Sequence, residues 1–138
     1  MAATASGYRE NLQIRDTATG RCLKTLCNVE TFVSAAAFSS DGTTVLSGTD
    51  KKKVQLWSVE TGQRLMTFKG HDERVTSVAY SPDGKTLLSS AMDGTLKLWS
   101  IELGLLVKTY FADRRWVFAA AFSPDGTQLL SGGEDRTL

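Results

Sequence analysis

The chain has 138 residues, of which 41% are hydrophobic and 22% charged, and its formal net charge is +1 at pH 7. This composition describes one folded domain, because disordered chains are poorer in apolar residues and carry a larger net charge. The near-neutral charge also argues against the strongly basic surface that nucleic-acid binding favours.

Short strands and tight turns alternate along the whole chain. The strands are rich in β-branched and aromatic residues and partly alternate in polarity; in chain order the clearest are Leu12–Asp16, Val54–Ser58, Val75–Tyr80 and Leu96–Ser100. The turns contain Asp or Glu shortly before Gly; they are Ser39–Gly42, Glu60–Gly62, Ser81–Gly84, Met92–Gly94, Glu102–Gly104 and Ser123–Gly126. Connections this short leave no room for a crossover helix, so we predict antiparallel meanders.

The same pattern returns at a fixed interval, since Ser39-Ser40-Asp41-Gly42 is repeated as Ser81-Pro82-Asp83-Gly84 and as Ser123-Pro124-Asp125-Gly126, each 42 residues further on. Several other residues coincide at this offset, namely Val33, Val75 and Val117, then Phe38, Tyr80 and Phe122, then Leu46, Leu88 and Leu130. We therefore predict that residues 1–138 form a single segment of repeats with a period of 42 residues. Its repeats are approximately 33–74, 75–116 and 117–138, the last one partial, and a partial unit at 1–32 precedes them.

A lone four-stranded sheet exposes its edges and needs neighbouring sheets to bury its apolar residues. The ordered motifs that recur resemble those of the WD-repeat (Trp-Asp repeat) β-propeller family, namely Gly70-His71, Ser81-Pro82-Asp83-Gly84, Leu88-Ser89, Asp93-Gly94 and Leu96-Lys97-Leu98-Trp99-Ser100. The resemblance implies an all-β fold, a WD-repeat-like β-propeller segment of about three four-stranded antiparallel blades. The Trp-Asp pair itself reads Trp57-Ser58 and Trp99-Ser100 here, and the Gly-His pair occurs once.

The resemblance also implies a buried hydrogen-bonded network in the middle repeat, formed by His71, Ser89, Asp93 and Trp99. Val29 and Lys51 replace its His and Asp in the preceding repeat, and Asp113 with Asp135 take these places in the following one. Only the middle repeat can then complete the network. His71 is the single histidine, and we expect it to be structural and not a catalytic acid or base.

No residue pattern indicates an enzyme, a cofactor or a metal. The recurring acidic residues Asp41, Asp83 and Asp125 precede Gly in separate turns, where a carboxylate bonds nearby backbone amides. The chain has neither a phosphate-binding Gly-rich loop nor a nucleophile elbow. We therefore expect a protein without catalytic activity, bound cofactor or metal.

A rigid ring of sheets presents loop residues from several blades on one face, which suits a protein-interaction scaffold. The resemblance places the residues that bind a protein or peptide partner at the rim where the innermost strands begin, namely Phe32, Ser34, Asp50, Arg74, Thr76, Met92, Trp116, Phe118 and Glu134. Exposed aromatics beside arginines are typical of binding hot spots. Alternatively, Trp116 and Phe118 pack between blades.

Two further functions stay open. One is a regulatory or sensory propeller segment that binds a ligand, and the other is weak nucleic-acid association through the basic runs Lys51–Lys53 and Arg114-Arg115. We expect the second to be weak and salt-sensitive, because it depends on few charges.

Propellers close with four to eight blades, so about three repeats do not complete a ring. Either the chain is part of a longer propeller, or it forms a homo-oligomer that completes the ring. Cys22 and Cys27 are too few for a disulfide framework, and no apolar run reaches the roughly 18 residues of a membrane helix. We therefore expect a cytoplasmic protein without membrane contact.

Overall fold

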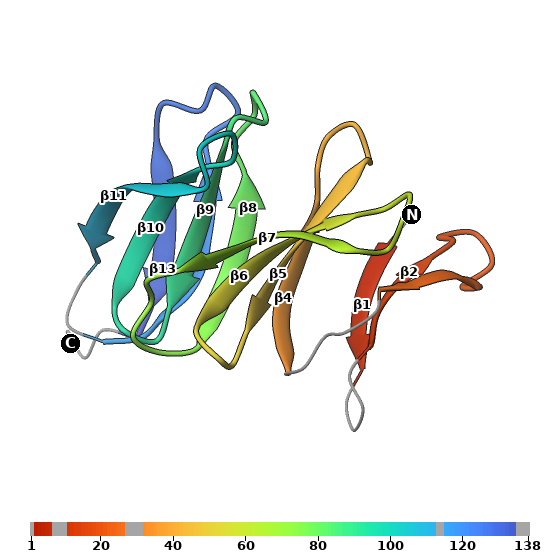
Figure 1. Cartoon of the computed structure of the whole chain (residues 1–138). Coiled ribbons are helices and arrows are strands. Elements are labelled where there is room, and N and C mark those ends of the chain that lie inside the picture. Colours follow the sequence, from red (N-terminus) through yellow and green to blue (C-terminus); the bar gives the residue numbers. More distant parts are fainter. Residues whose placement is uncertain (1, 7–10, 27–31, 113–114, 135–138) are drawn as a thin grey trace.

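The structure, a computed structural model, describes residues 2–6, 11–26, 32–112 and 115–134. The regular structure in these ranges consists of strands, which form four antiparallel sheets that follow one another along the chain (Figure 1). The described ranges contain no helix, and hence none with the length and apolar character needed to span a bilayer.

The first sheet contains β1 (Ala2–Ser6), β2 (Asn11–Arg15) and β3 (Cys22–Leu26). The second contains β4 (Val33–Phe38), β5 (Thr44–Thr49), β6 (Lys53–Ser58) and β7 (Arg64–Lys69). The third contains β8 (Val75–Tyr80), β9 (Thr86–Ala91), β10 (Thr95–Ser100) and β11 (Leu105–Phe111), and the fourth contains β12 (Val117–Phe122) and β13 (Leu129–Gly133). Within each sheet, strands adjacent in sequence pair with each other, which confirms the predicted antiparallel meander.

In the second, third and fourth sheets, the turn that joins the first two strands has the same geometry. Gly42 has φ +72° and its amide donates to the carbonyl of Ser39 at 3.0 Å. The Asp41 carboxylate accepts bonds from the Thr43 amide and from the Ser39 and Thr43 hydroxyls, which together lower its pKa to about 2. The pKa values of Asp83 and Asp125 are lowered by equivalent bonds, so each of these carboxylates stabilises its own turn.

The apolar core lies in the layers between successive sheets. Trp57 packs with Leu12, Ile14 and Leu26 between the first and second sheets. Between the second and third, the rings of Phe68 and Trp99 lie 5.6 Å apart. The third layer contains Leu88, Leu96 and Val117. Each sheet is therefore stabilised by apolar contact with the next, as in stacked repeat proteins.

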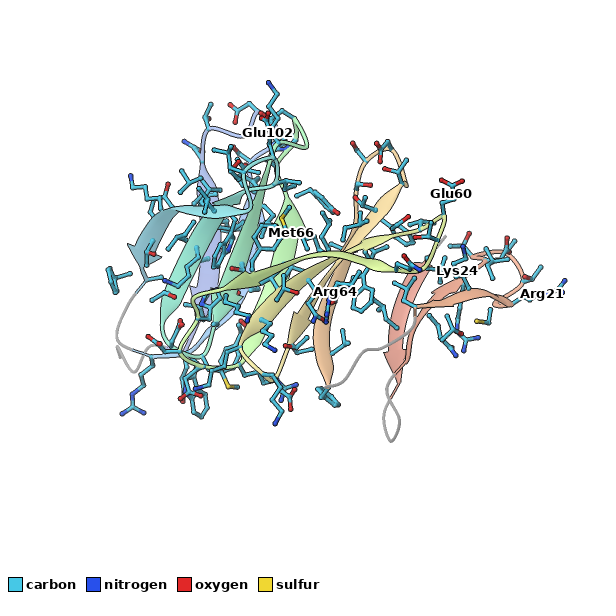
Figure 2. The ribbon with its side chains drawn as sticks, viewed as in Figure 1. Arg21, Lys24, Glu60, Arg64, Met66 and Glu102 are labelled. Atoms are coloured by element: carbon cyan, nitrogen blue, oxygen red, sulfur yellow. The ribbon has the colours of Figure 1, made fainter. Side chains whose placement is uncertain are left out.

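Polar side chains connect neighbouring sheets at both edges. The first strands lie side by side, and the Thr76 hydroxyl of β8 donates to the carbonyl of Val117 in β12 at 2.5 Å. At the outer edge, the Lys24 ammonium of β3 donates to the carbonyls of Val59 and Glu60, which precede β7 in the next sheet (Figure 2). These bonds set the position of one sheet relative to the next.

The outward face of the fourth sheet is not covered by another described sheet. Leu130 is 72% exposed there, whereas its equivalents Leu46 and Leu88 are 0% and 1% exposed. The difference arises because a following sheet covers Leu46 and Leu88.

Candidate functional site

The predicted binding residues lie along one edge of the stacked sheets, where β4, β8 and β12 begin and the β5–β6 and β9–β10 hairpins turn (Figure 1, lower edge). Three backbone bonds of 2.9 to 3.0 Å join them in equivalent pairs, from the amides of Asp50, Met92 and Glu134 to the carbonyls of Phe32, Arg74 and Trp116. We call these six residues and Phe118 the rim.

The aromatic residues of the rim are partly exposed and contact their neighbours. The Arg74 guanidinium lies 4.8 Å from the centre of the Phe32 ring, which is a cation–π geometry. Trp116 and Phe118 are 47% and 48% exposed, and their rings meet edge to face with centroids 6.2 Å apart. Val117 between them is buried, in agreement with the alternation of a strand.

Ser34 and Thr76, two further predicted rim residues, are half-buried between the sheets. The Ser34 hydroxyl donates to the carbonyl of Val75, as Thr76 does to that of Val117. Phe118 occupies the equivalent position in β12, and its side chain has no group that can donate such a bond. The first two inner strands therefore use this position to bond the next sheet, whereas β12 presents an aromatic ring there.

A hollow of about 340 Å³ opens beside Trp116. Its lining includes Phe111, Arg115, Trp116 and Glu134. A group bound in the hollow could therefore contact aromatic rings, a guanidinium and a carboxylate. Sequence reasoning missed Phe111, which is largely exposed at the end of β11. The signal that could have found it is the repeat itself, because an aromatic residue stands where the preceding repeat has Lys69.

His71, Ser89, Asp93 and Trp99 form one hydrogen-bonded chain in the third sheet. The Trp99 indole donates to the Ser89 hydroxyl at 2.8 Å, and this hydroxyl lies 2.7 Å from His71 Nε2. His71 Nδ1 lies 2.9 Å from the Asp93 carboxylate. A neutral imidazole protonated on Nδ1 satisfies every one of these contacts, since Ser89 then donates to Nε2.

Burial sets the protonation state of this network. It lowers the pKa of His71 below its ordinary value, although the hydrogen bond and charge of Asp93 oppose the change. Burial alone would raise the pKa of Asp93, but bonds from the Thr95 hydroxyl, the Asp72 amide and His71 outweigh it and lower the pKa. The pair is thus a neutral imidazole beside an ionised carboxylate near pH 7.

In the described residues of the second sheet, a part of such a network is present. The Trp57 indole donates to Ser47 at 2.9 Å, but Lys51 stands at the position of Asp93. Val29, Asp113 and Asp135, which the sequence comparison placed at the other network positions, lie outside the described residues, as does Arg114.

The chemistry of the remaining polar groups is limited. Within the described ranges, no three His, Cys, Asp or Glu side chains gather as metal ligands would. His71 is buried and bonded through both ring nitrogens, which leaves it no free position for a substrate. Cys22 is an exposed free thiol, and Cys27 is outside the described residues.

A comparison with protein families supports the resemblance seen in the sequence. The model of the WD domain, G-beta repeat, matches residues 20–58, 62–100 and 104–138, which together make up most of the chain. Each complete match starts near the last strand of one sheet and ends with the third strand of the next. A search of curated proteins found no match.

Proposed function

Because the chain belongs to the WD40 repeat family, we propose that it is a non-catalytic scaffold that binds a protein or peptide partner through its rim. WD40 repeats typically act as protein-interaction scaffolds and are usually non-catalytic. In this proposal the sheets are propeller blades, with repeats at 33–74, 75–116 and a partial one at 117–138, and a partial blade at 1–32.

The observation that carries the proposal is the exposed Trp116–Phe118 pair beside the hollow. Aromatic residues that become fully buried at the centre of an interface contribute most of its binding energy. Both side chains are already held by their mutual contact, so less conformational entropy is lost when a partner covers them. A side chain of the partner would enter the hollow and contact Trp116.

Substitutions that copy the equivalent residues of other repeats test this proposal with little risk to the fold. Trp116→Arg introduces the residue that stands at position 74, and Phe118→Ser the one at position 34. Peptides are first selected on the unaltered chain from a displayed random library, and their Kd values are then measured by calorimetry. We expect each substitution to weaken binding by about tenfold or more, which corresponds to about 1.4 kcal/mol.

Leu65→Ser is the matched control, because Leu65 is an exposed apolar residue of β7, the last strand of the second sheet, and is not part of the rim. It should leave the Kd unchanged. Selected peptides that bind the Trp116 and Phe118 variants as tightly as the unaltered chain would contradict the proposed rim.

A further inference from the structure

We propose that Lys51–Lys53, here called the basic hairpin, forms with Phe32 and Arg74 a subsite that binds an acidic segment of the protein partner. This inference rests on the proposed function and specifies the chemistry of one half of the rim. The partner segment would place carboxylates over the second sheet and its apolar residues over the fourth.

The first observation is a break in the repeat at the tip of the basic hairpin. In the matched β9–β10 hairpin, Asp93 bonds His71 and Gly94 has φ +78°. Lys51 and Lys52 take these two places. Lys52 has φ +66° and is the one residue other than glycine with positive φ in the described ranges. Left-handed backbone is strained for a side chain of this kind, and such strain concentrates at functional sites.

The second observation is the position of the basic hairpin. The amide of Asp50, directly before Lys51, donates to the carbonyl of Phe32 at 3.0 Å. Arg74 lies over the ring of the same Phe32. The basic hairpin and Arg74 therefore lie on one edge of the protein, since the residue before the hairpin and the Arg74 side chain both contact Phe32.

The third observation is that these cations form no ion pair with the residues that the structure describes. Asp50, Asp72 and Glu73 are their neighbours in sequence, yet in the part of the chain that the structure describes the ion pair found is that between His71 and Asp93. Unpaired cations at a partly exposed edge attract anions, and a guanidinium that already stacks on a ring still presents its N–H groups to a carboxylate.

The direction of the partner segment follows from how the inner strands adjoin. Thr76 and Val117 are bonded, so Arg74 lies between Phe32 on one side and Trp116 on the other. A segment that crosses the rim would meet cations first and then the Trp116–Phe118 pair. It would therefore carry Asp or Glu at one end and apolar residues at the other.

The experiment uses a labelled synthetic peptide with a run of glutamates followed by leucines, its counterpart with glutamines, and single-stranded oligothymidine. Fluorescence anisotropy measures their binding to the full chain at low and at physiological salt. We expect the glutamate peptide to bind most tightly and the combined substitution Lys51→Gln, Lys53→Gln to weaken it by about tenfold. Lys85→Gln, which removes an exposed lysine from a turn at the opposite edge, should have no effect.

Lys52→Gly separates binding from stability. Glycine adopts positive φ without the strain that lysine has there, so the urea concentration at the midpoint of unfolding should rise. The affinity for the glutamate peptide should fall by about threefold, because one positive charge is lost. The inference is overturned if the glutamine peptide binds equally well, if the lysine substitutions leave affinity unchanged, or if oligothymidine binds more tightly than the peptide. Should Trp116→Arg still weaken binding of the selected peptides by about tenfold in those cases, the proposed function stands without this subsite.

Discussion

Ser89 is bonded to two neighbours, whereas the equivalent Ser47 is bonded to one. The Ser89 hydroxyl bonds both the Trp99 indole and His71, whereas among the described residues that of Ser47 bonds the Trp57 indole alone. The two serines therefore occupy matched sites that differ by a single histidine contact. A substitution at Ser47 can therefore serve as the control for the same substitution at Ser89.

Ser89→Ala should lower the free energy of unfolding by about 2–3 kcal/mol, because it leaves two buried polar groups without a partner. Ser47→Ala should lower it by about 1 kcal/mol, since one group loses its partner. Urea unfolding followed by tryptophan fluorescence measures both. Equal losses in the two variants would show that the histidine contact contributes nothing to stability.

The protonation of His71 should make the stability depend on pH. Burial holds the folded-state pKa of His71 below the unfolded value of 6.5, so between these two values the unfolded chain binds a proton that the folded chain does not. The free energy of unfolding should therefore decrease as the pH falls below about 6.5 towards the folded-state pKa.

Denaturation curves from pH 7.5 to pH 5 test this, with His71→Gln as the comparison. The sequence has no other histidine, so the variant should lose most of the change in this window. An imidazole pKa above 6.5, measured by NMR in the folded protein, would reverse the expected sign.

At the scale of the strand, the hydroxyls near the start of β4 and β8 determine how the first strands adjoin. The Thr76 hydroxyl bonds both the Val117 carbonyl and the Ser90 hydroxyl, which lies 2.9 Å away. Phe118 at the same position of β12 replaces such a bond with exposed aromatic surface. In β4 and β8, the side chain at this position therefore bonds the next sheet. In β12, our proposal is that the side chain at the same position binds the partner.

Thr76→Val keeps the shape of the side chain and removes its hydroxyl. We expect a loss of about 1–2 kcal/mol in the free energy of unfolding, because the Val117 carbonyl loses its side-chain partner. Backbone amides of β12 should also exchange hydrogen faster. Thr86→Val is the control, since that hydroxyl makes no hydrogen bond in the described residues. Unchanged exchange in β12 would show that the bond does not hold the strands together.

Across the whole molecule, each complete match to the family contains strands of two sheets. The boundaries of the sequence repeats therefore differ from those of the sheets by about one strand. The last strand of one sheet and the first three of the next thus belong to one sequence repeat. This offset joins neighbouring sheets covalently and supports the apolar layers between them.

The uncovered face of the fourth sheet should make this chain associate at rising concentration, because exposed apolar patches and open strand edges favour association. Light scattering after size exclusion should show a mass that increases with concentration and decreases on Leu130→Lys. A discrete oligomer would favour completion of the ring by further copies, and polydisperse species would favour a longer propeller. A monomer at every concentration would contradict the expectation.

Local physical chemistry determined much of this protein from its sequence alone. The strands, the Asp-Gly turns and the 42-residue repeat depend on neighbouring residues, so Gly42 and Asp41 already indicate their turn. The resemblance to the WD-repeat family also implied that His71, Ser89, Asp93 and Trp99 form a set, and the structure brings these four residues together.

The tertiary structure decided which rim residues reach the surface, because exposure depends on strands far away in the sequence. Ser34 and Thr76 bond to carbonyls 41 positions away, and such contacts have no local signal. The hollow beside Trp116 and the positive φ of Lys52 likewise arise only when sheets and hairpins are assembled. Sequence determines what each repeat can form, and packing between repeats determines which of its side chains remain free to bind.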